Sequence, residues 1–267
     1  MRLRRFFTKK EKFVVPIISI GNLIVGGSGK TPFVIALATK YPHATIISRG
    51  YGRKSKGVVE VVREQKIIAT VEESGDEAML MANLLPNNII VSEDRKKAID
   101  YAISSGARLI LLDDGFNRVG IKKFEILLEP QYIPNRLPFP AGPFREFSFT
   151  KKEADLILQE GEDFSRVVSF SNLREKMILV TAIANPQRLN KYLPKGVIAK
   201  KIFPDHAYFD EKVMVDLLRN SGADTLLVTQ KDAVKLTPFM LPLSIMRLEL
   251  DIDASVFESI DKYINNH

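Results

Sequence analysis

The 267-residue sequence contains no cysteine. This absence excludes a disulfide framework, a thiolate metal site and a cysteine nucleophile, and it fits a reducing compartment. The chain has no apolar run of the roughly 18 residues that a membrane-spanning helix needs, and no apolar core typical of a secretory signal. We therefore expect a cytoplasmic protein without a transmembrane helix.

Hydrophobic residues make up 45% of the chain and charged residues 27%. Both values are close to globular averages, which excludes a disordered, collagen-like or coiled-coil protein. At about 150 residues per domain, the length predicts one large domain or two small ones. Either arrangement is long enough to bury a substantial core.

The net charge of +7 is concentrated at the N-terminus. Residues 1–12 carry six basic residues and one acidic residue, a charge of +5, which leaves +2 for residues 13–267. Nucleic-acid binders usually spread positive charge over a docking face, so that class is disfavoured. Leu3, Phe6 and Phe7 lie at helical spacing in this basic arm and suit an anionic membrane surface. A solvated tail explains the same residues equally well.

Short apolar runs alternate with amphipathic stretches along the chain. Val14–Ile20 predicts a buried strand, followed by a glycine-rich turn and a helix that begins near Thr31-Pro32. Repetition of this pattern predicts an α/β fold with a mainly parallel sheet flanked by helices. A second strand–helix series follows residue 172, so we expect one domain over 1–172 and a smaller α/β domain over 173–267.

The segment Pro130–Pro143 contains five prolines and predicts a loop. Loops of this length inside a compact domain are usually functional.

The strongest functional signal is Gly26-Gly27-Ser28-Gly29-Lys30-Thr31, between a predicted strand and a predicted helix. Glycines let backbone N–H groups surround phosphate oxygens, and a helix N-terminus adds partial positive charge. In the phosphate-binding pattern G-x-x-x-x-G-K-[ST], Lys30 reaches the β- and γ-phosphates and the Thr31 hydroxyl binds Mg²⁺. Ile24 replaces the first glycine of that pattern. The predicted nucleotide-binding segment of this P-loop NTPase-like fold runs from Ile24 and Val25 to Thr31.

Asp113 and Asp114 directly follow the apolar run Leu109–Leu112. The carboxyl end of a parallel strand faces the ligand crevice, and an aspartate there commonly serves Mg²⁺ in nucleotide sites. An isolated Asp-Asp-Gly is most often only a turn. Together with the glycine-rich loop, it predicts a metal site formed by Thr31, Asp113 and Asp114.

Two further residues allow a structural and a catalytic interpretation. Asp76, in Ser74-Gly75-Asp76-Glu77, is placed like a helix N-cap, although phosphoryl transfer to a hydroxyl also needs a positioned acceptor of the proton. His206 is one of three histidines and lies beside a predicted helix start. His43 lies in a predicted turn, where we expect it at the surface.

A basic cluster follows the second predicted strand: Arg49, Arg53, Lys54 and Lys56. It either faces phosphate or belongs to a solvated loop. The residues alone thus predict a Mg²⁺-dependent enzyme of nucleoside triphosphates and leave the phosphate acceptor open.

Eight sequence blocks occur in the order typical of one enzyme family. They are PIISIGNLIVGGSGKTP (16–32), SRGYGRKSKG (48–57), SGDEA (74–78), VSEDR (91–95), LDDGFNR (112–118), PAGPFRE (140–146), FPDHAYF (203–209) and VTQKDAVK (228–235). In these blocks the chain resembles the tetraacyldisaccharide 4'-kinases, whose phosphate loop also lacks the first glycine.

The resemblance implies transfer of the γ-phosphate of ATP to the 4'-hydroxyl of a tetraacylated glucosamine disaccharide 1-phosphate, giving lipid IVA. It implies phosphate and Mg²⁺ roles for Lys30 and Thr31 and a metal role for Asp113 and Asp114. It implies that Asp76 acts as the base, paired with His206, and that Arg145 is an active-site arginine. Such a pair shares a proton most readily within about 2.6–3.2 Å. Because we place the two residues in different domains, we expect them to stand apart until the domains close.

The same resemblance implies a peripheral enzyme on the cytoplasmic face of the inner membrane, with an acylated lipid substrate and no nucleic-acid partner. No obligate protein partner is inferred. Several positions depart from the family pattern: Ala78, Asn117-Arg118, Gln230, and a segment of only about 13 residues before the first strand. The alternative function is another P-loop small-molecule kinase or a regulatory NTPase.

Overall fold

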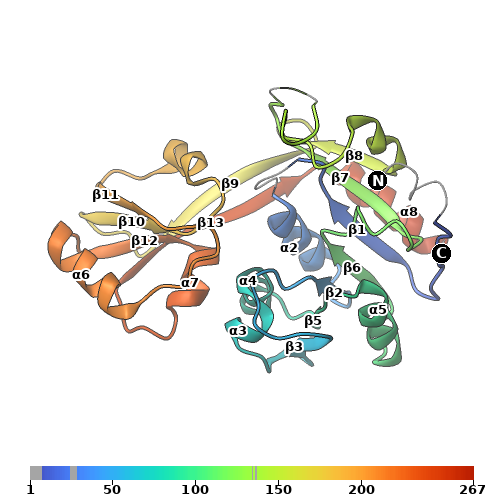
Figure 1. Cartoon of the computed structure of the whole chain (residues 1–267), viewed down its shortest axis with the longest axis horizontal. Coiled ribbons are helices and arrows are strands. Elements are labelled where there is room, and N and C mark those ends of the chain that lie inside the picture. The colour runs from blue at the N-terminus through green and yellow to red at the C-terminus, as the bar shows by residue number, and fades with distance from the viewer. Residues whose placement is uncertain (1–7, 25–28, 134, 136) are drawn as a thin grey trace.

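The computed structural model describes residues 8–24, 29–133, 135 and 137–267 (Figure 1). The strands are β1 (Ile17–Gly21), β2 (Thr45–Ser48), β3 (Val59–Arg63), β4 (Lys66–Ile67), β5 (Ile89–Val91), β6 (Ile110–Asp113), β7 (Phe124–Glu129), β8 (Leu156–Gln159), β9 (Phe164–Ser171), β10 (Met177–Thr181), β11 (Val197–Ile202), β12 (Thr225–Thr229) and β13 (Leu243–Ile252). The α-helices are α2 (Lys30–Lys40), α3 (Val71–Ser74), α4 (Asp76–Leu84), α5 (Arg95–Ser104), α6 (Glu211–Ser221), α7 (Gln230–Leu236) and α8 (Ala254–Asn265). Two 3₁₀ helices are η1 (Ser148–Glu153) and η2 (Pro186–Tyr192).

An eight-stranded sheet with the order β4-β3-β5-β2-β6-β1-β7-β8 forms the first lobe. From β5 to β8 all neighbouring strands are parallel, whereas the β3–β4 hairpin adds an antiparallel edge. The predicted mainly parallel α/β fold is therefore confirmed. Strand β6 lies beside β1, so Asp113 at the end of β6 is in register with Ile20 next to the predicted phosphate loop.

Side chains alternate between the two faces of the first sheet, and both faces are buried. Ile18 and Ile20 face a core that α2, α4 and α8 complete, while Ile17 faces the core under α5. Parallel sheets are normally covered on both faces, which explains why their strands read as continuous apolar runs. The helices on the α2 side bring the start of α2 and the start of α4 to the carboxyl ends of the strands.

The second lobe is a five-stranded sheet with the order β11-β10-β12-β13-β9. Strands β11, β10, β12 and β13 pair with one another in parallel, and β9 pairs antiparallel with β13 at the edge. Helices α6 and α7 cover one face of this sheet, through Met214 and Leu236, and η2 covers the other through Leu189 and Tyr192. This is the expected second, smaller α/β unit.

The strands β9 and β13 connect the lobes as a long two-stranded ribbon (Figure 1). Phe164 and Ile252 at one end pack in the core of the first lobe, whereas Phe170 and Met246 belong to the second lobe. Helix α8 then returns to the first lobe, where Tyr263 stacks on Phe124 with ring centroids 4.9 Å apart. The domain division at residue 172 stays a prediction. Strand β9 precedes that point but pairs in the second sheet, and α8 follows it but packs on the first.

Some local expectations differ from the structure. A hairpin over Val58–Val62 and Lys66–Val71 also fits the apolar pattern, but its second strand is only β4, because Thr70 caps a helix through its side chain and Glu73 completes a capping box. The ribbon strand β9 was not predicted. Within the described ranges, no helix combines the length and the hydrophobicity required to cross a bilayer.

Candidate active site

A cavity of about 890 Å³ opens between the carboxyl ends of the first sheet and the second lobe. Its lining includes Lys30 and Thr31 from α2, Asp113 and Asp114 at the end of β6, and His206 from the second lobe. Ligand sites of α/β folds lie at this edge of the sheet, and the volume is in the range of small-molecule sites. The cavity therefore brings together several of the residues that sequence analysis singled out from both halves of the chain.

The predicted phosphate loop is described at its two ends. Residues 25–28 (Val25, Gly26, Gly27 and Ser28) lie outside the described residues. Gly29 has a φ of 85° and precedes the first residue of α2, Lys30. Glycine adopts this left-handed conformation at the lowest energetic cost. The turn at Gly29 directs the free N–H groups of the helix start toward the cavity.

Lys30 and Ile24 are held by contacts around Asn22. The Nζ of Lys30 donates to Oδ1 of Asn22 at 3.0 Å, and Nδ2 of Asn22 donates to the carbonyl of Ile24 at 2.6 Å. Ile24 also forms a β-bridge with Phe144 and packs against that buried ring. An isoleucine thus replaces the first glycine of the strict pattern at a position that packs on apolar neighbours.

Asp113 is buried at the end of β6. One carboxylate oxygen accepts a hydrogen bond from Oγ of Ser48 at 3.0 Å. The other, Oδ1, has no hydrogen-bond partner within the part of the chain that the structure describes. Burial and the carboxylates of Glu77 and Asp114 raise the pKa of Asp113 to about 6. Nearby positive charge such as that of Lys30 thus compensates an ionised Asp113 only in part, and the carboxylate is suited to a cation.

Asp114 is more exposed and faces two basic side chains. Its carboxylate is 3.6 Å from Nζ of Lys30 and 3.4 Å from Nη1 of Arg145. Its φ of 54° is uncommon for a residue other than glycine, and such strained residues cluster at functional sites. The predicted active-site residue Arg145 thus lies beside the predicted metal pair.

Within the described ranges, no group of three or more histidine, cysteine, aspartate or glutamate side chains forms a metal cage. Mg²⁺ usually takes only one or two carboxylates from the protein and completes its shell with waters and substrate phosphates. Asp113 with its unpartnered Oδ1, Asp114 and the Thr31 hydroxyl supply such hard oxygen donors on one cavity wall. The residues present fit a magnesium ion.

Asp76 begins α4 but does not cap it. The N-cap is Gly75, with no side-chain capping bond, so the N-cap interpretation of Asp76 is wrong. Gly75 has a φ of 83°, and a Cβ there would lie 2.7 Å from the carbonyl oxygen of Tyr51. Glycine is therefore required for the turn that places Asp76, whose exposed fraction is 5%.

The carboxylate of Asp76 is hydrogen-bonded to His206. The distances from Nδ1 of His206 to the two oxygens are 3.0 and 3.1 Å. Burial alone raises the pKa of Asp76, but the His206 hydrogen bond and the charges of Lys231 and Lys235 outweigh it and lower the pKa. The expectation that Asp76 and His206 stand apart is wrong for this structure, in which the two lobes already bring them into contact.

The second lobe fixes the backbone of His206. Its φ is 60°, and its N–H donates to the carbonyl of Ala182 at 3.0 Å. Ala182 is itself held by buried Asp232, which accepts from the Ala182 N–H at 3.0 Å and from Thr181 Oγ1 at 2.7 Å. The ring of Tyr51 lies 4.7 Å from the imidazole, centroid to centroid. The position of His206 therefore depends on residues from both lobes.

The basic cluster after β2 divides into different environments. Arg53 is bound internally, to the Glu93 carboxylate and to the carbonyl of Gly57 at 2.6 Å. Lys54 lies 5.5 Å above the ring of Tyr208. Arg49, by contrast, lines the cavity. Of this cluster, the geometry favours Arg49 for contact with a ligand.

Several site residues were not predicted: Lys231 and Lys235 on α7, Glu77 on α4, Ser48 and Asn22. Lys231 donates to Oε1 of Glu77 at 3.1 Å, and Nζ of buried Lys235 lies 3.6 Å from Asp76. All five residues lie inside the sequence blocks quoted above, so those blocks could have identified them as candidates. Their roles depend on contacts between the lobes, which sequence spacing does not specify.

Two of the departures from the family pattern are structurally accommodated. Ala78 is buried inside α4, and Gln230 begins α7, where its Oε1 accepts the N–H of Leu248 at 3.2 Å. The structure gives no specific account of Asn117, which is exposed. His43 is exposed, as expected.

Known proteins match this chain over nearly its whole length. The family profile described as tetraacyldisaccharide-1-P 4'-kinase (LpxK) matches residues 1–266. The tetraacyldisaccharide 4'-kinase of Helicobacter pylori (strain HPAG1) is 46% identical over 265 residues, 98% of this chain and 84% of the relative. That of Aliarcobacter butzleri is 47% identical over 274 residues, 98% of this chain and 87% of the relative.

The fold is also similar to a solved structure. The crystal structure of LpxK from Aquifex aeolicus in complex with ATP has a TM-score of 0.80 and 28% identity, with 98% of this chain and 93% of that chain covered. Profile, relatives and fold agree over nearly the entire length of the sequence. The chain belongs to the tetraacyldisaccharide 4'-kinase family.

Proposed function

We propose that this chain transfers the γ-phosphate of ATP to the 4'-hydroxyl of a tetraacylated glucosamine disaccharide 1-phosphate, giving lipid IVA. One observation carries the proposal beyond family membership. A single cavity is lined by the lysine at the start of α2, by the aspartate pair and by a histidine bonded to a buried carboxylate. Phosphoryl transfer to an alcohol needs these parts: charge stabilisation, metal ligands and an acceptor for the hydroxyl proton.

Lys30 and Arg145 supply positive charge for the transferring phosphoryl group. Both side chains contact Asp114 and line the cavity, so both are already aimed at the place where negative charge develops. Such preorganised charge stabilises the transition state without reorganisation during the reaction. The residues from Ile24 to Thr31 hold the phosphates through backbone N–H groups.

Asp113, Asp114 and Thr31 hold the magnesium ion. When bound, Mg²⁺ neutralises charge on the β- and γ-phosphates. A cation beside Asp113 also supports ionisation of this carboxyl, whose pKa of about 6 reflects burial without sufficient positive charge.

His206 and Asp76 handle the proton of the acceptor hydroxyl. His206 lines the cavity, whereas Asp76 lies behind it against Nδ1. Asp76 acts as the base, and His206, in contact with it at 3.0 Å, orients the carboxylate and shares the proton.

The test is acceptor dependence of ATP consumption. With detergent-solubilised tetraacyldisaccharide 1-phosphate, ATP turnover should rise at least tenfold over the rate without acceptor, and the product should carry a new phosphate at the 4' position. The Lys30→Ala variant is the negative control. Equal ATP hydrolysis with and without the acceptor would instead favour the alternative, a regulatory NTPase.

The chain acts as a peripheral protein on an anionic membrane surface, the cytoplasmic face of the inner membrane. Support comes from the +5 charge of residues 1–12, of which Arg2, Leu3, Arg4, Arg5, Phe6 and Phe7 lie outside the described residues. Nearby, Lys10 is 3.7 Å from Glu153 of η1, next to the exposed, stacked rings of Phe147 and Phe149. Basic and aromatic side chains on one surface suit anionic headgroups and the membrane interface.

Vesicle sedimentation tests this attachment. Deletion of residues 2–12 should reduce binding to anionic vesicles at low salt, by about 1 kcal/mol per basic residue lost near the surface, and leave turnover on micellar substrate unchanged. Vesicles of neutral lipid are the control. Undiminished sedimentation of the deletion variant would assign attachment to another surface, such as the loop 130–143.

A further inference from the structure

Arg166 lies on β9, in the ribbon that joins the lobes, and its guanidinium group packs against the start of α2. A Cβ built on Gly29 would lie 3.0 Å from Nη2 of Arg166 and 3.6 Å from its Cζ. A side chain at residue 29 would therefore press on the guanidinium group, in addition to the strain that its φ of 85° would cause. The sequence pattern of the phosphate loop ends at Thr31 and does not include this arginine.

Glu160, in the turn between β8 and β9, holds the guanidinium group of Arg166. The Nε of Arg166 donates to Oε1 of Glu160 at 2.6 Å, and Nη2 donates to Oε2 at 3.1 Å. The exposed fractions of the two side chains are 12% and 15%. Two parallel hydrogen bonds to a carboxylate fix the plane of an arginine as well as its position. Protein contacts alone thus orient this side chain.

The contact with Glu160 leaves most donors of Arg166 for other acceptors. A guanidinium group has five N–H donors, of which this contact uses two. Within the part of the chain that the structure describes, the other three donors have no protein acceptor. Because Arg166 lines the cavity, these donors are available to the acceptor oxygens of a ligand.

The surroundings of Arg166 favour a bound anion. A helix N-terminus carries partial positive charge, and Lys30 adds a full charge at the first residue of α2. Glu160 offsets the charge of Arg166, and Asp114, 3.6 Å from Nζ, offsets that of Lys30. A phosphate group at the helix start is attracted by the helix N-terminus and by both cations. The location of the arginine therefore suits a polyanion better than a neutral ligand.

The ribbon face that carries Arg166 continues as an apolar wall of the cavity. Side chains two residues apart lie on the same face of a strand, so Val168 follows Arg166 on this face, with Leu248 opposite it in register. Both apolar residues line the cavity together with the arginine. The charged group thus stands where an apolar wall meets the start of α2, which suits a ligand with an apolar base and charged phosphates.

We propose that Arg166 binds the α- and β-phosphates of the nucleotide through the donors that Glu160 leaves free. In the phosphate-binding pattern, backbone N–H groups of the loop surround these two phosphates, whereas the lysine reaches the β- and γ-phosphates. Arg166 packs on the last glycine of that loop, away from the group that is transferred. The inference rests on the proposed function, because that function identifies the ligand as ATP. The competing explanation is structural: the ion pair only closes the turn between β8 and β9.

Direct measurement of nucleotide binding, without the lipid acceptor, separates these explanations. We compare Arg166→Gln and Arg166→Lys with Arg247→Gln, which replaces an exposed arginine on the other strand of the same ribbon. Isothermal titration gives the Kd of each protein for ATP with Mg²⁺. Inorganic tripolyphosphate serves as a second probe that lacks the base and the ribose. Thermal unfolding verifies that each variant is folded.

Arg166→Gln should raise the Kd for ATP by about 10- to 100-fold, because hydrogen bonds between charged groups are the strong ones. The Kd for tripolyphosphate should rise by the same factor, within about threefold, because the lost contact is with phosphate. Arg166→Lys keeps the charge without the planar fork and should lose less. Arg247→Gln should stay within about twofold of wild type for both probes.

Turnover gives an independent measurement. A contact away from the transferred group stabilises the bound substrate and the transition state equally, so the KM for ATP should rise while kcat falls by less than about threefold. A Glu160→Gln background then tests the structural explanation. If the pair only closes the turn, Arg166→Gln adds no loss once the carboxylate is gone, whereas a phosphate contact predicts a further rise in Kd of at least about fivefold.

Three results would overturn the role of Arg166. They are an unchanged Kd for ATP in folded Arg166→Gln, an unchanged Kd for tripolyphosphate, and the absence of a further loss in the Glu160→Gln background. If Arg166→Gln does not fold, Arg166→Lys carries the same comparison, and wild-type affinity of that variant for both probes would overturn the role. A wild-type protein that binds ATP without acceptor-dependent turnover would instead remove the proposed function and leave the arginine contact in place.

Discussion

The two ends of the parallel strands in the first lobe differ in chemistry. At the carboxyl ends, buried or half-buried polar groups contact charged partners, as Asp76 contacts His206 and Lys30 contacts Asp114, and the pKa values of Asp76 and Asp113 are shifted. At the amino ends, a depression of about 440 Å³ is lined by turn residues: Pro42, His43, Ala44, Glu64, Gln65, Pro86, Asn88, Gly106 and Arg108.

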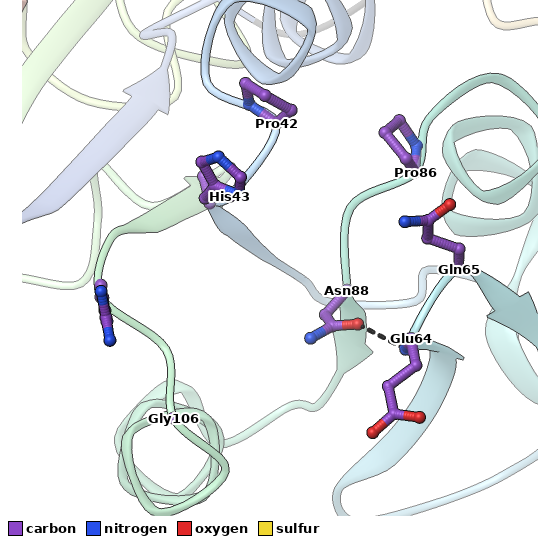
Figure 2. Close-up of a pocket in the computed structure, with 9 residues that line it drawn as sticks. Pro42, His43, Glu64, Gln65, Pro86, Asn88 and Gly106 are labelled. Carbon is purple, nitrogen blue, oxygen red and sulfur yellow. Dashed lines mark hydrogen bonds between the residues drawn. The ribbon is translucent and has the colours of Figure 1, made fainter.

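Figure 2 shows this second depression, with His43 on one side and Asn88 and Glu64 on the other. The backbone N–H of Glu64 donates to Oδ1 of Asn88 at 2.9 Å, which ties the β3–β4 turn to the chain before β5. Glu64 and Gln65 have positive φ values, as the hairpin turn requires. A hollow alone therefore does not indicate function; partly desolvated ionisable groups that converge on it do.

The largest expected effect is at the carboxyl ends, where Lys30→Ala should lower kcat by about 10²–10⁴-fold. The substitution removes charge stabilisation of the transferring phosphoryl group, which is typically worth several kcal/mol. Thr31→Ala should also lower turnover strongly. Lys40→Ala, at the exposed end of the same helix, is the control. Wild-type rates for Lys30→Ala in the acceptor-dependent assay would contradict the phosphate-loop assignment.

The next effect concerns the proton acceptor. His206→Ala and Asp76→Asn should each lower kcat by about 10²–10³-fold, in the range for general base catalysis, and change the KM for ATP little. Because the two groups act as a unit, the double variant should lose much less than the product of the single losses. Strictly multiplicative losses would indicate that the 3.0 Å contact is not used in the reaction.

At Asp113 we expect a smaller effect on a different quantity: replacing the carboxyl should increase the free energy of unfolding. In the folded state its pKa is about 6, above the ordinary value of 3.8. The fold therefore loses stability as pH rises from 3.8 to about 6, and above this interval the loss is complete. Asp113→Asn keeps an oxygen for the Ser48 hydroxyl without the charge. At pH 8 without Mg²⁺, we expect it to raise the free energy of unfolding by about 1–3 kcal/mol, since one pKa unit is about 1.4 kcal/mol.

The gain from Asp113→Asn should shrink toward zero at about pH 3 and below, where the wild-type carboxyl is largely protonated in both states because even its ordinary pKa is 3.8. Denaturant unfolding at the two pH values measures it. The same variant should lose Mg²⁺-dependent activity. Equal stability of wild type and variant at pH 8 would mean that the buried carboxylate is compensated by charge.

The smallest effects are expected at the amino ends. His43→Ala and Arg108→Ala replace exposed side chains, so both should leave kcat within about twofold and the free energy of unfolding within about 0.5 kcal/mol of wild type. Acceptor-dependent kinetics and thermal unfolding measure both. A tenfold loss of activity would show that the difference between the two ends of the sheet has been misjudged.

Periodicity and turn chemistry predicted most of the fold. Strand β1 is a continuous apolar run, because the sheet is buried on both faces. Helix α2 follows it and was predicted from its amphipathic pattern. Strand β9 escaped detection because its residues alternate between exposed and half-buried along the ribbon that joins the lobes. The packing of α8 on the first lobe was also missed, since the contact of Tyr263 with Phe124 links residues far apart in the chain.

Some residues of the candidate site could be predicted from local sequence, and others could not. Lys30 and Asp113 follow from local strand–loop–helix chemistry. For Asp76, local chemistry favoured a helix cap, and only the family resemblance paired it with His206. Lys231 and Glu77 could not be paired from the sequence, because their contact depends on the docking of α7 against α4.

The return of α8 to the first lobe has a consequence for synthesis of the chain. Val256 and Ile260 of this last helix belong to the same buried cluster as Phe33 and Leu37 of α2. Chains emerge from the ribosome N-terminus first, and domains generally fold as units. The nucleotide-binding lobe therefore lacks part of its core until α8 is made, so that lobe reaches its full stability only after the whole second lobe has been synthesised.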